Sequence, residues 1–194
     1  MNHGLKMEPP AELIARIRPH AERAGCWRPV PFAKGRRISC RDEAGARLII
    51  IERGLVKLSY TDAEGDERVK SFIAAEGLFE LGGADGALSY DAVCLEPTRA
   101  VALPLAWVGE LAGSDAEVRR AVDAFWLWLS ARKRAREHAL LCSTPLQRYL
   151  AFQTGEPMLA ARLPQGDIAR YLGVTPVAFS RIKRRLRSPL QAKL

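Results

Sequence analysis

The sequence predicts an α+β protein in which a β-rich first half is followed by helices. Short β-rich runs separated by glycines occupy residues 30–105, whereas apolar residues at helical spacing dominate residues 115–187. The chain has 194 residues, which fits one large domain or two small ones. About half of its residues are apolar, so a substantial core can form.

Five runs in the first half have the β-branched and aromatic composition of strands: 47–51, 55–60, 68–73, 92–95 and 100–103. Glycines punctuate these runs at intervals of about ten residues, a spacing typical of a compact barrel or sandwich. Residues 62–66 lie between two of the runs and predict a hairpin turn. A short helix over residues 9–24 is expected to precede the strands.

One long helix is predicted from Asp115 to about Ser143, with Ser114 or Asp115 as its cap. Such a helix would be ~43 Å long, which exceeds what a small domain needs to cover its core. We interpret one face as packing on the β-rich domain and the other as packing on a second copy of the chain. The alternative is a single buried core helix. The candidate dimer contacts are Phe125, Trp128, Ala131, Ala135 and His138.

The last fifty residues predict a helix-turn-helix. Thr144 caps a supporting helix, with Pro145 at its first position and Gln147 placed for a capping box. Further on, Ala169 supplies the small residue needed where two helices cross, and Gly173 supplies the turn. Thr175 and Pro176 then start the second helix.

The second of these helices has a polar, basic face suited to the major groove of DNA. An Arg near its start can form two hydrogen bonds with guanine, and later Arg residues suit phosphates. Residues 130–194 hold thirteen Lys and Arg against three Asp and Glu, a net charge of +10. The alternative is an ordinary helical hairpin with a basic surface. The predicted DNA-binding residues are Thr175, Val177, Ser180, Arg181, Arg184, Arg185 and Arg187.

At these residues the chain resembles the Crp/Fnr family of bacterial transcription regulators. The motifs that carry the resemblance are Leu163-Pro164-Gln165, Asp167-Ile168-Ala169, Tyr171-Leu172-Gly173-Val174-Thr175-Pro176, Ser180-Arg181-Ile182 and, earlier, Lys34-Gly35, Glu52-Arg53-Gly54, Glu64-Gly65 and 76–81. The resemblance covers roughly residues 30–187. It implies a jelly-roll-like effector β-roll (1–112), a dimerisation helix (113–143) and a helix-turn-helix domain (144–194). A homodimer on double-stranded DNA, with RNA polymerase as a further partner, is implied as well.

The effector site departs from the family pattern. Family members that bind cyclic AMP hold its phosphate with an Arg, and residues 87–92 contain none. Glu80 matches the ribose-binding Glu of the family, but a carboxylate alone repels a phosphate. This departure counts against cyclic AMP and leaves the effector open. The expected pocket residues are Glu80, Leu81, Ser89 and Tyr90.

Two further departures concern DNA. Val177 stands where the family often has Glu; Glu accepts a hydrogen bond from cytosine, whereas Val can only touch a thymine methyl group. We therefore expect an altered sequence preference. Only residues 188–194 follow the second helix, too few for the usual two-stranded wing, so we expect that wing to be missing or vestigial.

Other function classes find little support in the sequence. No nucleophile–base pair, Walker loop, G-x-G-x-x-G motif or metal-ligand spacing is present, so we expect neither an enzyme nor a metal site. The four cysteines form no Cys-x-x-Cys pair and suggest thiols in a reducing cytoplasm. No apolar stretch is long enough for a membrane span. The alternative function is a ligand- or redox-sensing protein with degenerate DNA binding.

Overall fold

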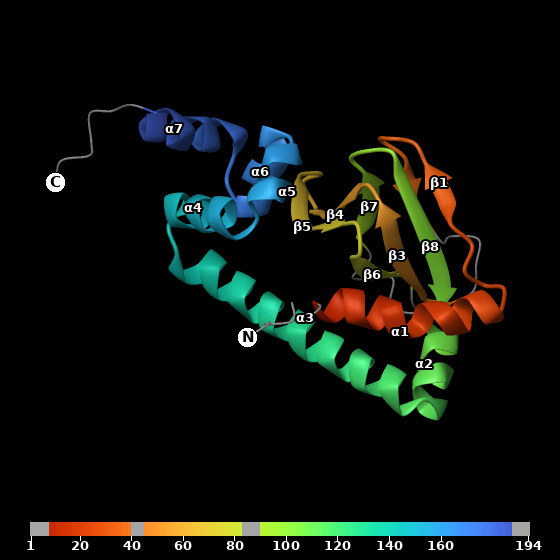
Figure 1. Cartoon of the computed structure of the whole chain (residues 1–194). Helices are drawn as coiled ribbons and strands as arrows, with labels where there is room; N and C mark the ends of the chain where they lie inside the picture. The colour runs from red at the N-terminus through yellow and green to blue at the C-terminus, as the bar shows by residue number, and fades with distance from the viewer. Residues whose placement is uncertain (1–7, 40–44, 83–89, 188–194) are drawn as a thin grey trace, which may run out of the picture. The chain divides into compact units, whose positions relative to one another are not determined.

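The computed structural model describes residues 8–39, 45–82 and 90–187, and it has the predicted α+β class. Its helices and strands follow one another as Figure 1 labels them. In chain order they are α1 (Pro9–Arg23), β1 (Val30–Phe32), β2 (Arg37–Ile38), β3 (Arg47–Arg53), β4 (Leu55–Thr61), β5 (Glu67–Ala74), β6 (Leu78–Leu81), β7 (Asp91–Cys94), β8 (Thr98–Pro104), α2 (Leu105–Ser114), α3 (Ala116–Cys142), α4 (Pro145–Gly155), α5 (Pro157–Arg162), α6 (Gln165–Leu172) and α7 (Pro176–Arg187).

The strands form two four-stranded sheets with the orders β1-β8-β3-β6 and β2-β7-β4-β5. The pairings β1–β8, β2–β7, β3–β6, β3–β8 and β4–β7 are all antiparallel. Apolar side chains from both sheets form one buried cluster, which includes Ile49 of β3, Val56 of β4 and Ala92 of β7. The β-roll predicted for the first half is therefore a two-sheet structure with its own core.

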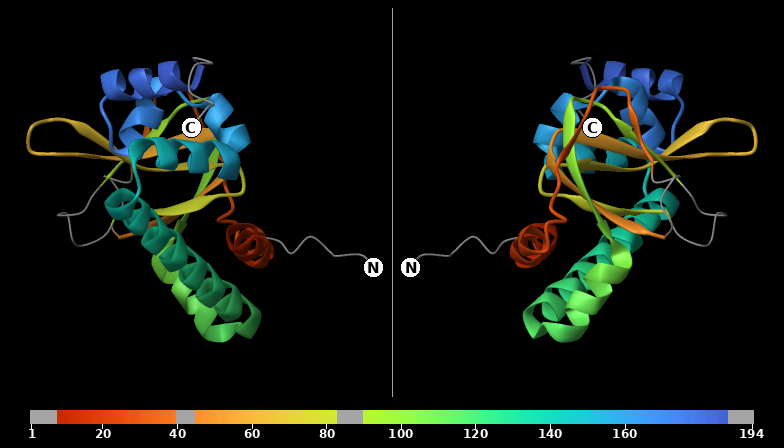
Figure 2. Two further views of the ribbon diagram at one scale, coloured as in Figure 1. Left: turned by 90° about the vertical axis from the view of Figure 1, so that its left-hand side faces the viewer. Right: turned by 90° about the vertical axis from the view of Figure 1, so that its right-hand side faces the viewer.

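Residues 48–51 of the central strand β3 are all apolar because both faces of the strand are covered there. Ile49 and Ile51 belong to the cluster between the sheets, whereas Leu48 and Ile50 belong to a second cluster on the outer face. Helices α1, α2 and the first half of α3 cover that outer face. In Figure 2, α1 is seen close to end-on at the foot of the strands.

The predicted hairpin turn joins β4 to β5. The backbone N–H of Asp62 donates to the carbonyl of Asp66 at 3.0 Å, and the carboxylate of Asp62 accepts from the Asp66 N–H at 2.8 Å. Gly65 has φ +85°, a conformation that L side chains rarely adopt. The turn is therefore specified by an acidic side chain and one glycine, as the sequence indicated.

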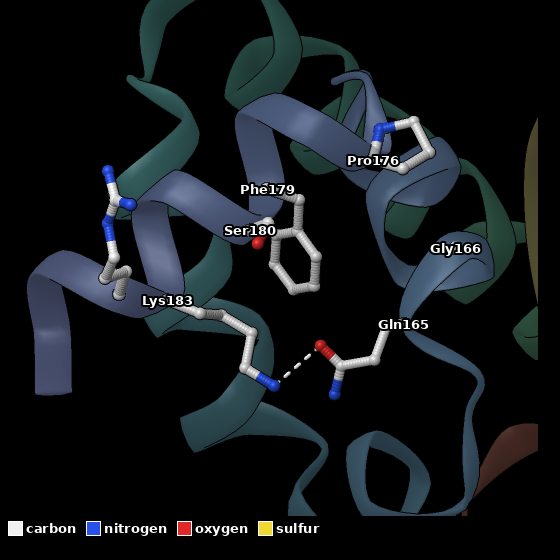
Figure 3. A pocket seen from close by; sticks show the side chains of 7 residues that line it. Gln165, Gly166, Pro176, Phe179, Ser180 and Lys183 are labelled. Atoms are coloured by element: carbon white, nitrogen blue, oxygen red, sulfur yellow. Dashed lines mark hydrogen bonds between the residues drawn. The ribbon is translucent and has the colours of Figure 1, made fainter.

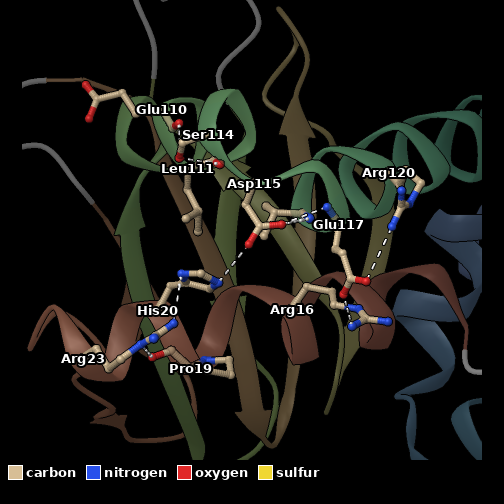
Figure 4. A network of polar contacts seen from close by, with 11 residues as sticks. Arg16, Pro19, His20, Arg23, Glu110, Leu111, Ser114, Asp115, Glu117 and Arg120 are labelled. Atoms are coloured by element: carbon tan, nitrogen blue, oxygen red, sulfur yellow. Dashed lines mark hydrogen bonds and ion pairs between the residues drawn. The ribbon is translucent and has the colours of Figure 1, made fainter.

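Asp115 fills the capping role that the sequence left open between Ser114 and Asp115. Its Oδ1 accepts from the backbone N–H groups of Glu117 at 2.8 Å and Val118 at 3.2 Å. These two bonds hold the pKa of the Asp115 carboxyl below its ordinary value. Figure 4 shows how ion pairs from α1 meet this helix start: His20 lies 3.4 Å from Asp115, and Arg16 lies 2.5 Å from Glu117.

The chain divides into two compact units. The N-terminal unit comprises Met1–Tyr60 and Ser71–Ala131, and the C-terminal unit comprises Thr61–Lys70 and Arg132–Leu194. The tip of the β4–β5 hairpin therefore belongs with the C-terminal helices, and α3 contributes to both units. None of the described helices is both long and apolar enough to cross a membrane.

Candidate DNA-binding site

Helix α4 begins as the sequence predicted. The hydroxyl of Thr144 accepts from the Gln147 N–H, and the Gln147 side chain accepts from the Thr144 N–H, which completes a capping box. A short helix, α5, follows α4 and starts at Pro157. Proline is favoured at the first position of a helix because its missing N–H would have no partner there.

The crossing of α6 and α7 meets the steric requirements read from the sequence. Ala169 is fully buried on α6, and its carbonyl accepts from the Val174 N–H at 3.0 Å. Gly173 closes α6 in the left-handed conformation, at φ +71°. A Cβ at this position would meet Leu140 Cδ2 at 3.4 Å, which is ordinary contact. Glycine is therefore needed at this turn for its conformation rather than for space.

The start and the anchor of α7 are equally well defined. Thr175 Oγ1 accepts from the Ala178 N–H at 3.2 Å, which confirms Thr175 as the cap. Phe179 is 2% exposed, and its ring meets that of Tyr149 edge-on with centroids 4.9 Å apart. Ile168 and Leu172 of α6 are buried as well. The core below α7 is thus built from α4, α6 and α7.

The opposite side of α7 carries a polar and basic surface, here called the recognition face. At about 100° per residue, positions 177, 180, 181 and 184 share one side of the helix. Val177 is 63% exposed, an unusual degree of exposure for a β-branched apolar side chain. The recognition face consists of Val177, Ser180, Arg181, Arg184 and Arg185, all of them exposed. Arg187 ends α7, but its side chain lies outside the described residues.

A hollow of about 420 Å³ separates the start of α6 from α7 (Figure 3). It is lined by Gln165, Gly166, Pro176, Phe179, Ser180, Lys183 and Arg184. Lys183 Nζ donates to Gln165 Oε1 at 2.6 Å, which links the two helices beside the recognition face. Lys183 was not among the predicted DNA-binding residues, although its position one turn after Phe179 places a cation at the edge of the hollow.

The expected effector residues are only partly brought together. Tyr90 donates its hydroxyl to the backbone carbonyl of Glu80, and burial, with the charge of Glu80, raises the pKa of Tyr90. The Glu80 side chain is exposed, and Leu81 packs against the core between the sheets. Ser89 lies outside the described residues.

A second hollow, of about 520 Å³, lies elsewhere in the N-terminal unit. Among the described residues that line it, Arg28 and Arg47 are charged and most of the others are apolar. Arg47 alternates with Ile49 and Ile51 along β3 and therefore shares their side of the sheet. Arg47 was not among the predicted site residues, although a cation directly before four consecutive apolar residues was a visible signal.

The face of α3 expected to form a dimer is partly used within the protomer. Phe125 is 6% exposed in the cluster under α1 and α2, and Trp128 packs against the same cluster. Phe125 is therefore unavailable to a second copy. The sequence indicated two apolar faces of α3, and the protomer covers the face that contains Phe125. Ala131, Ala135 and His138 are exposed, as are Leu127 (73%) and Leu141 (78%).

The described cysteines differ in their exposure. Cys94 is buried, which raises the pKa of its thiol, whereas Cys142 is exposed at the end of α3. Among the described residues, no group of three or more His, Cys, Asp or Glu side chains could hold a metal ion. Cys40 lies outside the described residues.

Neither a protein-family model nor a curated protein sequence matches the chain. Solved structures do. FixK2 from Bradyrhizobium japonicum superposes with a TM-score of 0.71 at 20% identity, covering 82% of this chain and 84% of that one. CprK, solved in complex with OCPA, gives 0.65 at 19% identity over 89% and 82%. A protein from Eubacterium rectale, described as a regulator of the Crp/Fnr family, gives 0.67 at 14% identity over 88% and 83%.

The chain has the Crp/Fnr fold. The matches cover most of both chains, so the likeness includes the β-roll, the long helix and the C-terminal helices together. At these identities the likeness establishes the fold alone. What the Crp/Fnr fold does in this chain must therefore be argued from its own residues.

Proposed function

We propose that the chain is a sequence-specific DNA-binding transcriptional regulator that acts as a homodimer. The observation that carries this proposal is the recognition face of α7, which is exposed and basic while Phe179 anchors the opposite side of the helix. A helix held in this way can enter the major groove with Val177, Ser180 and Arg181 toward the base edges. Arg184 and Arg185 lie further along and suit phosphates.

The dimer is proposed to form along α3. Five exposed residues follow the alternating four- and three-residue spacing of a coiled coil: Leu127, Ala131, Arg134, His138 and Leu141, here called the dimer seam. The seam retains two of the residues predicted from sequence, Ala131 and His138. Leu127 and Leu141 are 73% and 78% exposed, and packing against a second copy would remove this apolar surface from water. Two polar residues between them would fix the register of the pair.

The N-terminal unit is proposed to bind a small effector. The hollow beside Arg47 has a volume within the range of ligand sites, roughly 300–1,000 Å³. Arg28 and Arg47 supply positive charge, and none of the described lining residues is acidic. An anion with an apolar body fits this lining best. CprK, which shares the fold, was solved with a bound compound, and this supports an effector role for the β-roll here.

Selection from random DNA duplexes, with and without cyclic AMP, tests the central proposal. We expect an enriched palindrome whose half-sites lie about one helical turn apart, as a two-fold dimer requires. Because the family's phosphate-binding Arg has no counterpart in residues 87–92, we expect cyclic AMP to leave enrichment unchanged. If no sequence is enriched in either condition, the chain does not read DNA unaided and the proposal fails.

Sedimentation analysis tests the dimer. The double variant Leu127→Glu and Leu141→Glu should sediment as a monomer, because paired carboxylates would oppose each other along the seam. The matched control is Trp126→Glu, which alters an exposed apolar residue next to the seam. A wild-type monomer at micromolar concentration would contradict the dimer while leaving the DNA-binding proposal open to its own test.

A further inference from the structure

One arginine of α3 connects the β4–β5 hairpin to the helix-turn-helix. Arg136 Nη2 donates to the carbonyl of Val69 on β5 at 3.0 Å and to the carbonyl of Tyr171 on α6 at 2.9 Å. Its guanidinium also lies over the Tyr171 ring, 3.9 Å from the centroid. All three residues belong to the C-terminal unit, in which Figure 1 shows β5 beside α6.

A second contact joins the same hairpin to the same helix. Arg170 of α6 lies 3.7 Å from the Glu67 carboxylate on β5 and 3.3 Å from the Asp167 carboxylate. The Asp167 side chain is largely buried, whereas Arg170 and Glu67 are partly exposed. Solvent screens the ion pair between Arg170 and Glu67, so it connects the hairpin to α6 more weakly than Arg136 does.

The chemistry at Arg136 requires an arginine. Its planar guanidinium can donate to two carbonyls and stack on an aromatic ring at once, whereas a lysine ammonium acts as a point charge. Burial lowers the pKa of Arg136, but arginine remains charged in proteins, so both hydrogen bonds are charge-assisted. A charged guanidinium of α3 thus binds the C-terminal end of α6 through the Tyr171 carbonyl.

The position of Arg136 on α3 gives this contact its consequence. Arg136 lies two residues from both Arg134 and His138 of the dimer seam. At about 100° per residue, a two-residue separation places it on the opposite side of the helix. One side of α3 thus carries the seam while the other holds α6, and α6 shares its core with the recognition helix α7.

We propose that Arg136 is a positioning residue that sets the spacing of the two recognition helices in the dimer. The proposal rests on the DNA-binding function argued above. Arg136 fixes α6 against α3 and the hairpin, and α3 joins the two copies. Two rigidly placed recognition helices meet both half-sites of a palindrome with a high effective concentration for the second contact. A loosened α6 lowers that effective concentration without changing any base contact.

The test compares Arg136→Lys and Arg136→Met with the wild type on four duplexes: the selected palindrome, a single half-site, and palindromes with one base pair added to or removed from the spacer. Lys133→Met is the matched control, since it removes one positive charge from an exposed neighbour on the same helix. Thermal unfolding of every variant is recorded alongside.

We expect both Arg136 variants to lose roughly tenfold in affinity for the palindrome, because the second half-site is no longer preplaced. For the single half-site, Arg136→Met should bind like Lys133→Met, and Arg136→Lys, which keeps its positive charge, should bind like the wild type. Discrimination among spacer lengths should weaken, and a merely structural role would not produce this change. Arg136→Lys should behave like Arg136→Met, because an ammonium cannot bridge both carbonyls while stacking.

Three outcomes would overturn the proposal. Equal loss on palindrome and half-site would make Arg136 a general stabiliser. Tighter binding of the palindrome would mean that the contact holds the recognition helices in the wrong arrangement. Unchanged spacer discrimination would show that the position of α6 does not depend on Arg136. Failure of the wild type to bind any selected duplex would instead remove the proposed function itself.

Discussion

Different interactions stabilise the interior of each of the two units. The N-terminal unit buries two apolar clusters, one on each face of β3, where Ile49, Ile50 and Ile51 are consecutive and at most 1% exposed. Among the largest fully buried side chains of the described residues, Phe179 alone comes from the C-terminal unit. That unit relies instead on hydrogen bonds from arginines to helix-end carbonyls, such as Arg148 Nε to Leu172 at 2.9 Å.

This difference fits the separate roles proposed for the two units. A close-packed sheet core resists deformation and suits a domain that must keep a defined cavity. A small helical core with polar ties exposes most of its surface and leaves α7 free to present its side chains. The C-terminal unit should therefore respond more strongly to single substitutions, and its response should be visible in DNA binding.

The largest effect is expected for Phe179→Ala. Removing a buried aromatic ring costs about 3–5 kcal/mol, and the C-terminal unit has few other large buried side chains to compensate. Calorimetry should show a lowered transition for this unit and an unchanged transition for the N-terminal unit, together with lost DNA binding. Ile50→Ala should cost about 2–5 kcal/mol. It should lower the transition of the N-terminal unit and leave that of the C-terminal unit unchanged. A common shift in both variants would mean that the units unfold as one.

The next effect concerns how the C-terminal unit reads DNA. Arg181→Ala should cost about 1–3 kcal/mol on the selected site and relax specificity at one base pair. Arg185→Ala and Arg187→Ala should weaken all duplexes almost equally, because a lost phosphate contact carries no sequence information. Competition binding against single-base variants of the site measures both effects. If Arg181→Ala also weakened every sequence alike, Arg181 would be a phosphate contact.

A smaller effect isolates backbone conformation from packing. Gly173→Ala should destabilise the C-terminal unit by about 1–2 kcal/mol, because φ +71° is unfavourable for alanine although the space is adequate. Gly155→Ala is the matched control: it ends α4 without a positive φ, and an added Cβ meets nothing. The control should be neutral or slightly stabilising in denaturant unfolding. Equal behaviour of the two variants would contradict a conformational role for Gly173.

The sequence was most informative where residues are periodic or where a turn demands one residue type. The five predicted runs became β3, β4, β5, β7 and β8, and the capping box and Gly173 turn were found as expected. Strands β1, β2 and β6 were missed. Three residues in β1 and two in β2 are too few to show alternation. Pairing with β8, β7 and β3 places them instead.

Contacts that involve the backbone of a distant element left no trace in the sequence. Arg136 donates to the carbonyls of Val69 and Tyr171, and any residue offers a carbonyl. The spacing of apolar residues also indicated two faces of α3, but not which face the protomer covers. Phe125 was therefore assigned to the dimer contact, whereas it packs inside the protomer. By contrast, the recognition face follows from local spacing within one helix, which the sequence specifies completely.

The finest test of the recognition face concerns a single methyl group. Val177 is exposed at the first turn of α7 and has no hydrogen-bonding group. Of the four bases, thymine alone presents a methyl group in the major groove, so an apolar contact from Val177 selects thymine. Replacing that thymine with deoxyuracil removes only the methyl and should cost about 0.8 kcal/mol.

Each thymine of the selected site is replaced by deoxyuracil in turn, and affinities are measured for the wild type and for Val177→Ala. One position should matter to the wild type and not to the variant, whose shorter side chain has already lost the contact. At that position 5-methylcytosine should bind better than cytosine, because it restores the methyl group alone. If no thymine is sensitive, Val177 makes no base contact. The specificity of α7 would then depend on its hydrogen-bonding side chains alone.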